Sequence, residues 1–213
     1  MKATYVFLVL ALSVIYAEAE VKTPLSAVAY VEGPDGVKGN ITFTQNECGE
    51  PVFIRVYVAG LQAGLHGFHV HEKGDLTNGC MSTGGHYNPD KLEHGAPSDE
   101  IRHVGDLGNI KADEFGVSDT TLTDHLISLA GPRTIIGRGL VIHSNEDDLG
   151  RGGHPDSKKT GNAGGRVACG VIGVKSPEEW KVCSTDGSAL HGSNLAIIAI
   201  SLFSLLVVQV VKL

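Results

Sequence analysis

The stretch VFIRVYV at residues 52–58 decides the fold. Every second residue in it is Val or Ile, whereas Arg55 and Tyr57 stand between them, and such alternation predicts a β-strand with one buried face. Similar short segments recur along the chain, separated by turns rich in Gly, Pro and Asp, and no segment has a convincing helical period. We expect eight strands, at residues 27–31, 40–44, 52–58, 64–71, 108–111, 117–123, 139–143 and 166–174.

The composition also favours a turn-rich β protein. The 213 residues include 28 glycines and only 6% aromatic residues, which suits an all-β, antiparallel sandwich or flattened barrel. Two connections, at residues 72–102 and 144–165, exceed the about 15 residues usual in compact domains, so we expect two functional loops ordered by metal, disulfide or hydrogen bonds. The net charge of −7 argues against general binding of nucleic acids.

Both ends of the chain have the pattern of targeting segments. Residues 1–19 combine an apolar run with the cleavage-site sequence Ala17-Glu18-Ala19, which predicts a secretory signal peptide rather than a buried N-terminal helix. Residues 195–213 form an apolar tail after a polar linker at 177–194, which fits either a GPI-anchor signal or a retained membrane anchor. The main domain is then expected at residues 22–176 of a secreted, extracellular protein, with the tail as its candidate membrane attachment.

Export would place the cysteines in an oxidising compartment, where disulfides persist. Spacing alone leaves three pairings open for the four residues Cys48, Cys80, Cys169 and Cys183. Export would also make the sequence Asn40-Ile41-Thr42 a usable sequon for N-glycosylation, provided that Asn40 is exposed.

A set of metal-binding side chains has spacings that suit two neighbouring ions: His69, His71, His86, His94, His103, Asp106 and His143. Residues two apart on a strand share one face, so His69 and His71 point the same way, and an antiparallel pairing can bring His143 close to them. Two four-coordinate metals need eight ligand positions. Seven residues supply eight positions if one histidine binds through both ring nitrogens.

The donors divide into two groups by type. One group contains only imidazoles, which suits copper(II), and the other contains a carboxylate, which suits zinc. The first group is His69, His71 and His143, and the second is His94, His103 and Asp106. Because His86 lies between the groups in sequence, it is the predicted bridge. The other histidines are interpreted as non-ligands: His66, His125, His154 and His191.

Two strings give the sequence a specific resemblance: GFHVHE at residues 67–72 and GNAGGRVACG at residues 161–170. Through them, residues 25–174 resemble a copper/zinc superoxide dismutase of the secreted type. The resemblance implies an eight-stranded Greek-key barrel, a homodimer, and superoxide as the substrate. It also implies that copper binds at His69, His71, His86 and His143, and that zinc binds at His86, His94, His103 and Asp106.

The resemblance further implies roles for residues around the metals. Asp147 corresponds to a carboxylate that accepts hydrogen bonds from His69 and His94 and so fixes both rings. Arg166 is expected to hold the substrate anion by charge and hydrogen bonds. His86 is expected to carry a proton during dismutation. Two residues are expected to line the substrate channel: Lys159 and Thr160.

The disulfide pattern also follows from the resemblance. It implies a Cys80–Cys169 bond that ties the long ligand loop to the last strand. In this barrel the last strand pairs with the first, so its end lies near the turn that carries Cys48. We therefore hypothesise a second bond between Cys48 and Cys183.

Two other classes of function stay open at this stage. A copper-delivery protein usually carries exposed thiolate pairs, and no Cys-x-x-Cys occurs in the chain. A catalytically silent adhesion or decoy domain would have lost a copper ligand or Arg166, and none is missing. A superoxide-decay assay with a His143→Ala control separates these classes from an enzyme.

Overall fold

The computed structural model describes residues 25–175. Their strands are β1 (Leu25–Glu32), β2 (Lys38–Gln45), β3 (Val52–Ala59), β4 (Gly64–His71), β5 (Thr77–Cys80), β6 (Asp106–Ala112), β7 (Ser118–Asp124), β8 (Gly139–His143), β9 (Arg166–Val171) and β10 (Gly173–Val174). Two short helical segments accompany them, the 3-10 turn η1 (Met81–Thr83) and the α-helix α2 (Ser157–Thr160).

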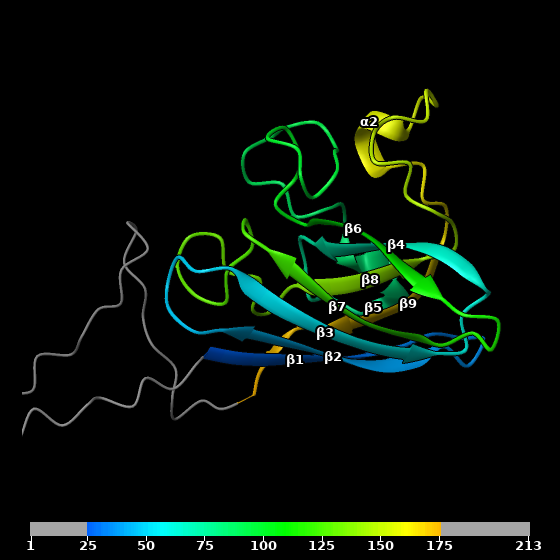
Figure 1. The fold of residues 1–213 in the computed structure, drawn as a ribbon, viewed down its shortest axis with the longest axis horizontal. Coiled ribbons are helices and arrows are strands. Elements are labelled where there is room, and N and C mark those ends of the chain that lie inside the picture. Colours follow the sequence, from blue (N-terminus) through cyan, green and yellow to red (C-terminus); the bar gives the residue numbers. More distant parts are fainter. Residues whose placement is uncertain (1–24, 176–213) are drawn as a thin grey trace, which may run out of the picture.

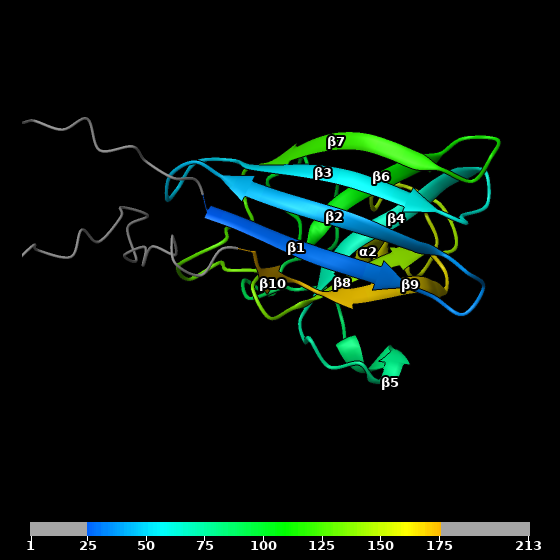
Figure 2. The same ribbon diagram turned by 90° about the horizontal axis from the view of Figure 1, so that it is seen from below.

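Eight of these strands form one antiparallel sheet that curls into a nearly closed barrel (Figure 1, Figure 2). Their spatial order is β6-β4-β8-β9-β1-β2-β3-β7, and β10 adds to β1. The strands at the two ends of this path, β6 and β7, lie against each other. The chain leaves the order of neighbours between β3 and β4 and again between β7 and β8, which gives the predicted Greek-key character.

Side-chain alternation explains how the strands build the core. On β3 the four aliphatic residues are fully buried, whereas Phe53, Arg55 and Tyr57 on the other face are exposed. On β4 the residues Phe68 and Val70 join the same core. Burial of such aliphatic and aromatic side chains contributes about 1.5–3 kcal/mol each and is the main force that closes the barrel.

The eight expected strands are all present, with differences at the ends and in the last one. Residues 166–174 do not form a continuous strand, because the fully buried Ile172 separates β9 from β10. Its backbone N–H donates to the carbonyl of Arg138, and its carbonyl accepts from the N–H of Gly137. The backbone of residues 137–138 thus takes the place of a neighbouring strand there. The short elements β5, η1 and α2 were not expected.

The later part of the first long connection and the second connection lie together on one side of the barrel, over β4, β6 and β8 (Figure 1), whereas β5, in the first connection, lies beside β9 (Figure 2). The two connections run through residues 72–105 and 144–165. The backbone N–H of His94 donates to the carbonyl of Lys158 at 2.9 Å, which joins the two loops. The N–H of Tyr87 donates to the carbonyl of Val70, and that of Gly67 to Asn145, which holds each loop against β4. Hydrogen bonds therefore order both loops, as expected.

Several sequence-based predictions concern residues outside the described range 25–175. They are the signal peptide at 1–19, the linker at 177–194 and the apolar tail at 195–213. The domain limits at 22 and 176 likewise stay predictions. Between residues 25 and 175, the structure contains no helix with the length and apolar character needed to cross a membrane.

Candidate metal centre

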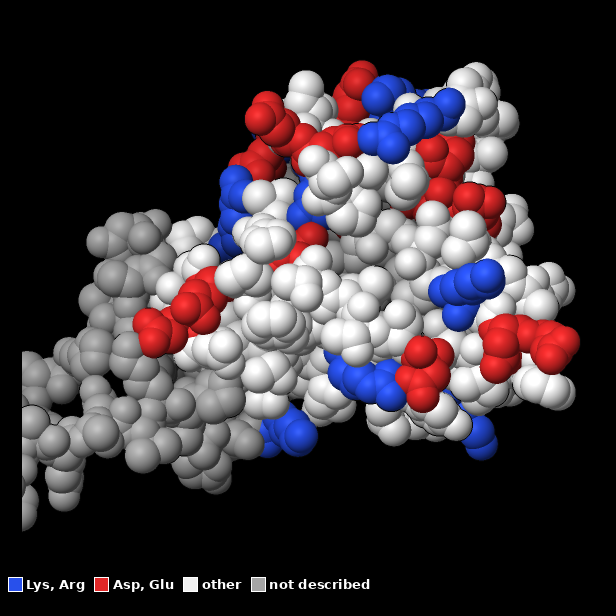
Figure 3. Space-filling view, in the orientation of Figure 1, with Lys and Arg blue, Asp and Glu red and all other residues white. Residues whose placement is uncertain are grey.

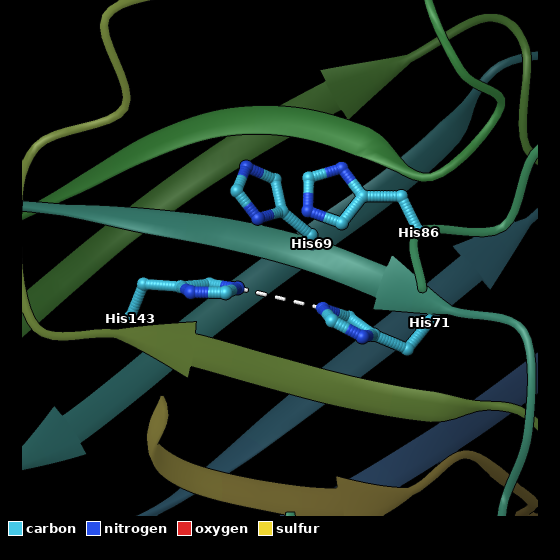
Figure 4. A group of neighbouring side chains, drawn as sticks. All are labelled: His69, His71, His86 and His143. Atoms are coloured by element: carbon cyan, nitrogen blue, oxygen red, sulfur yellow. Dashed lines mark hydrogen bonds between the residues drawn. The ribbon is translucent and has the colours of Figure 1, made fainter. Parts of the chain in front are cut away.

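Four imidazole rings converge on the outer side of β4 (Figure 4). His69 and His71 come from β4, His143 ends the neighbouring strand β8, and His86 comes from the 72–105 loop. All four are buried, and each offers a ring nitrogen that lies within 4.8 Å of the corresponding nitrogen of the other three. The antiparallel pairing of β4 with β8 brings these segments together, although they lie about seventy residues apart in sequence.

Backbone carbonyls fix the orientation of two of these rings. Nδ1 of His71 lies 2.8 Å from the carbonyl oxygen of Gly84, and Nδ1 of His143 lies 3.3 Å from that of Gly164. A carbonyl oxygen only accepts hydrogen bonds, so each Nδ1 carries the proton. The two Nε2 atoms then face each other at 3.4 Å with their lone pairs toward the shared centre.

Carboxylates fix the other two rings in the same way. Nε2 of His69 donates to Asp147 at 2.8 Å, and Nδ1 of His86 donates to Asp106 at 2.8 Å. The remaining nitrogens, Nδ1 of His69 and Nε2 of His86, are buried without a hydrogen-bond partner among the described residues. Buried polar atoms are rarely left unpaired. An ion that these four rings coordinate would satisfy them.

A second group of ligand atoms surrounds Asp106 at the start of β6. The Nδ1 atoms of His86, His94 and His103 lie 2.8, 3.0 and 3.1 Å from its carboxylate oxygens. The second oxygen of Asp106 also accepts the backbone N–H of Gly95 and of His103, which fixes the carboxylate. His86 belongs to both groups, with Nε2 toward the first and Nδ1 toward the second.

Asp147 connects the two groups from the 144–165 loop. Its two oxygens accept Nε2–H of His69 and Nε2–H of His94, each at 2.8 Å. Asp147 could itself count as a ligand with these two histidines. We interpret these contacts as hydrogen bonds, because they leave Nδ1 of each ring free for its own group.

Asn109 on β6 is a site residue that sequence reasoning missed. Its side-chain N–H donates to the carbonyl of Asp147, and its side-chain oxygen accepts the N–H of Asp147, both at 2.8 Å. This pair of bonds holds Asp147 in place. Asn109 lies three residues after Asp106 on β6, and nothing in its sequence context marks it as a site residue.

Gly161 is a position beside the site that requires glycine. Its φ is +64°, in the left-handed region that L side chains rarely adopt. A Cβ atom there would collide with the carboxylate of Asp147 and with Nε2 of His94. The glycine at the start of the GNAGG string thus allows the loop to approach both groups closely.

Burial keeps three rings of the first group, His69, His71 and His143, in their neutral form. It lowers the pKa of His69 to about 3, that of His71 to about 2 and that of His143 to about 4, and the neighbouring His86 contributes to each shift. At neutral pH these rings are therefore neutral. A neutral imidazole is the form that binds a metal ion.

Around Asp106 and Asp147 the electrostatics are different. Burial alone would lower the pKa of His94, but the carboxylates of Asp106 and Asp147 outweigh it and raise that pKa to about 9. Burial would raise the pKa of both carboxyl groups, yet the facing histidines hold it well below the usual range. Both carboxylates are thus ionised and attract positive charge. The second group consequently fits a divalent cation with nitrogen and oxygen ligands.

Arg166, the first residue of β9, is held next to the imidazole group. Its guanidinium donates to the carbonyl of Cys80 at 2.7 Å, the hydroxyl of Thr83 at 2.9 Å and the carbonyl of Gly84 at 2.7 Å. Gly84 also accepts the proton of His71. One loop therefore positions both the arginine and a ring of the first group, and the arginine stays partly exposed.

The comparisons with known proteins agree with this geometry. Residues 37–172, more than half of the chain, match the family model described as copper/zinc superoxide dismutase (SODC). The chain belongs to the copper/zinc superoxide dismutase family. A relative from Drosophila melanogaster, named extracellular superoxide dismutase [Cu-Zn], is 62% identical over 157 residues, which cover 71% of this chain and 87% of the relative. The resemblance seen in the sequence is confirmed, and with it the oxidoreductase class and the metals copper and zinc.

The Cys80–Cys169 disulfide implied by membership of the copper/zinc superoxide dismutase family is present. It joins the end of β5 to β9 across 89 residues of chain. Cys80 also provides a carbonyl for Arg166, so the bond braces the loop that positions the arginine. Cys48 lies partly buried in the turn between β2 and β3, whereas Cys183 lies outside the described residues. Their pairing stays a prediction.

The two residues expected to line the channel of the copper/zinc superoxide dismutase lie on α2. Lys159 and Thr160 are exposed, and Nζ of Lys159 lies 3.9 Å from a carboxylate oxygen of Asp156. Figure 3 shows acidic and basic residues intermingled at the end of the molecule that carries α2. The positive charge there is thus local and partly balanced.

The histidines interpreted as non-ligands lie outside both groups where the structure describes them. His66 is buried, but its two ring nitrogens face the carbonyl oxygens of His143 and Gln62 at 2.7 and 2.8 Å. His125 and His154 are exposed. His191 lies outside the described residues.

Proposed function

We propose that this copper/zinc superoxide dismutase removes superoxide outside the cell. In the reaction, two superoxide anions and two protons give one dioxygen and one hydrogen peroxide. One observation carries the proposal: His86 turns one nitrogen toward an all-imidazole group and the other toward a group with a carboxylate. This arrangement fits two different metals that share one ring.

The ligand sets follow from the atoms that face each centre. Copper would be held by the first group and zinc by the second, with His86 in both: His69, His71, His86 and His143 for copper, and His86, His94, His103 and Asp106 for zinc. When bound, copper supplies alternate one-electron oxidation and reduction of superoxide, and zinc supplies fixed positive charge. The unpaired nitrogens Nδ1 of His69 and Nε2 of His86 support this assignment.

Arg166 is the proposed docking group for the anion. Three oxygens hold its guanidinium in one orientation, so little conformational freedom is lost when an anion binds. The three oxygens that accept hydrogen bonds from this guanidinium are two backbone carbonyls and a hydroxyl, none of which carries a negative charge. The charge of the guanidinium is therefore available to the small substrate.

His86 is the proposed proton carrier. Burial lowers the pKa of His86, so the ring is neutral before it accepts a proton. Nε2 is the atom that faces the first group, and it can hold the proton and pass it to the reduced product. Asp106 and Asp147 keep the rings aligned during this exchange.

Lys159 and Thr160 are proposed to guide superoxide toward the centre. The protein has a net charge of −7, so an anion is repelled at long range and depends on local positive charge. Such steering weakens as salt screens exposed charges. Increasing ionic strength should slow catalysis, and a flat salt dependence would contradict the role of Lys159.

The proposed place of action is extracellular. The Drosophila relative carries that word in its name, and the Cys80–Cys169 bond suits an oxidising compartment. Attachment to the cell surface through residues 195–213 stays a proposal. Release of surface activity by a phospholipase that cleaves GPI anchors would support a lipid anchor, and retention would support a peptide anchor.

A homodimer is proposed from the family alone. Sedimentation of the purified protein at several concentrations tests it, and a monomer throughout would contradict it.

The test of the function is superoxide decay in the presence of the protein loaded with copper and zinc. We expect rapid decay with the wild type and none above background with His143→Ala. A copper-delivery protein would bind copper without this activity, and a silent module would do neither.

A further inference from the structure

Thr83 places a buried hydroxyl against the arginine beside the metal centre. It ends the 3-10 turn η1, and the residue is fully buried. Oγ1 of Thr83 accepts an N–H of Arg166 at 2.9 Å and donates its own hydrogen to the carbonyl of Cys80 at 2.8 Å. The same Nη1 atom of Arg166 donates to that carbonyl at 2.7 Å. The hydroxyl, the carbonyl and the guanidinium therefore form a closed triangle of hydrogen bonds.

The chemistry of the groups fixes the direction of each bond in this triangle. A guanidinium only donates, and a carbonyl only accepts. The hydroxyl of Thr83 has a single hydrogen, which the carbonyl of Cys80 receives, so a lone pair of Oγ1 faces Arg166. The other two acceptors of Arg166 are the backbone carbonyls of Cys80 and Gly84, which any residue type would supply. The hydroxyl is the acceptor that depends on a side chain.

Packing holds the Thr83 side chain in this orientation. Its Cβ and Cγ2 atoms lie against Gly139 of β8, where an added Cβ atom would come within 2.9 and 2.8 Å of them. The backbone carbonyl of Thr83 accepts the N–H of Lys73 at 3.0 Å. A β-branched side chain has few allowed χ1 rotamers, so contact on the methyl side fixes the place of the hydroxyl. The acceptor is thus in position before any anion binds.

Two N–H groups of Arg166 stay available to an anion. A guanidinium has five N–H groups. Those of Nη1 donate to Cys80 and Thr83, and one of Nη2 donates to Gly84. Among residues 25–175, the Nε–H group and the second N–H of Nη2 donate to no protein atom. Neighbouring N–H groups of a guanidinium can hold an anion at two points.

We propose that Thr83 is a positioning residue for Arg166: its hydroxyl fixes the guanidinium so that the two remaining N–H groups meet the anion. The inference rests on the proposed docking role of Arg166 and adds the residue that sets the affinity of this docking site. Without the hydroxyl, Nη1 loses an acceptor and the guanidinium gains freedom to turn. The anion then binds only the fraction of the protein in which the guanidinium has the right orientation, so its apparent affinity falls.

The experiment uses azide, a small monoanion that is not consumed by the protein. Its dissociation constant is measured on protein loaded with copper and zinc, by titration followed in the absorption spectrum of copper(II). Thr83→Val keeps the shape of the side chain but lacks the hydroxyl. We expect it to weaken azide binding by about 10-fold, as for the loss of one hydrogen bond to a charged group. Thr83→Ser keeps the hydroxyl and should bind azide as the wild type does.

These variants separate positioning from packing. If Thr83 acted only by filling space, Thr83→Val would resemble the wild type, and Thr83→Ser, which lacks the methyl group, would bind azide more weakly. That outcome would overturn the inference. Ser82→Ala is the matched control, because Ser82 lies in the same turn but its hydroxyl accepts the N–H of Asn78. It should bind azide as the wild type does.

Two further measurements keep the test decisive. Copper and zinc content is determined for each variant. If Thr83→Val does not retain both metals, Thr83→Ala replaces it, because Thr83→Ala and Thr83→Ser differ only in the hydroxyl. Azide is also titrated into Arg166→Ala. Weakened binding there, with wild-type binding in Thr83→Val, would overturn the role of Thr83 and leave the docking role intact. Unchanged binding in Arg166→Ala would overturn both.

Discussion

The strands β3 and β4 have the same length and lie in the same barrel, but they differ in what covers their outer faces. Both turn apolar residues into the core: Ile54 and Val56 from β3, and Phe68 and Val70 from β4. On β3 the opposite side chains, such as Tyr57, face solvent. On β4 the opposite side chains are His69 and His71, which are buried.

The difference shows how this fold separates stability from chemistry. The residues 72–105 and 144–165 cover β4 and bring His86, His94 and Asp147 over it. The barrel core therefore supplies stability, and the covered outer face supplies the metal ligands. Substitutions on the two sides should have different consequences.

The largest effect on stability is expected from Ile54→Ala on β3. Ile54 is fully buried, and removal of such a side chain costs about 2–5 kcal/mol because a cavity remains. Metal content should not change. Chemical unfolding with metal analysis tests this, with Arg55→Ala as the control. The exposed Arg55 side chain lies outside the core and contacts Asp119 and the backbone carbonyls of Val56 and Thr120. An exposed ion pair of this kind contributes about 0–1 kcal/mol. Loss of metal from folded Ile54→Ala would contradict the separation between the core of the barrel and its metal ligands.

The next effect is expected from Arg166→Glu. Removal of a positioned donor reduces turnover by about 100-fold, and the reversed charge repels the anion. The histidine contacts do not involve this side chain, so copper and zinc content should stay close to that of the wild type. Steady-state superoxide decay tests this together with metal analysis. Full activity in Arg166→Glu would contradict its proposed role.

A smaller effect is expected from Asp147→Ala. Loss of a carboxylate that orients metal ligands typically weakens metal affinity by about 10–100-fold. Because Asp147 holds rings of both groups, affinity for both metals should fall. Competition with a chelator measures this, and Asp148→Ala is the control from the same loop. Equal affinities in Asp147→Ala and the wild type would refute the orienting role.

The smallest effect is expected from pH in the metal-free protein. The folded-state pKa of His69, His71 and His143 lies below the ordinary 6.5, so the unfolded chain binds more protons below pH 6.5. These three rings therefore lower the free energy of unfolding as pH falls from 6.5 toward 4 and below. The raised pKa of His94 has the opposite effect: it stabilises the folded state below pH 6.5, and this contribution is lost as pH rises through about 9. The lowered pKa of His86 acts in the same direction as those of the three rings, so together they outweigh His94.

The free energy of unfolding should therefore fall by about 1 kcal/mol between pH 7 and pH 6. Urea unfolding at both pH values measures it. Unchanged or higher stability at pH 6 would contradict the assigned neutral rings.

The sequence predicted the elements whose pattern is local. Alternation placed the strand at residues 52–58, and short segments bounded by turns placed the other seven main strands. The types and spacing of the donors placed the seven side chains that the structure brings together. The short elements were not predicted; the four residues of α2, for example, are too few to show a helical period. The interruption of the last strand at Ile172 was not predicted either, because it depends on hydrogen bonds to a backbone segment distant in sequence.

The contacts that orient the site could not be read from the sequence. The carbonyls of Gly84 and Gly164 fix His71 and His143, and any residue type would supply a carbonyl. Asn109 can hold the backbone of Asp147 only because β6 places the two residues side by side. Such roles depend on tertiary geometry rather than on residue type.

The central claim is that His86 is shared by the two metals. Its most direct test is the copper and zinc content of purified His143→Ala, His94→Ala and His86→Ala. We predict that His143→Ala loses copper but keeps zinc, that His94→Ala loses zinc but keeps copper, and that His86→Ala is depleted of both. A His86→Ala protein that loses only one of the metals would contradict the account.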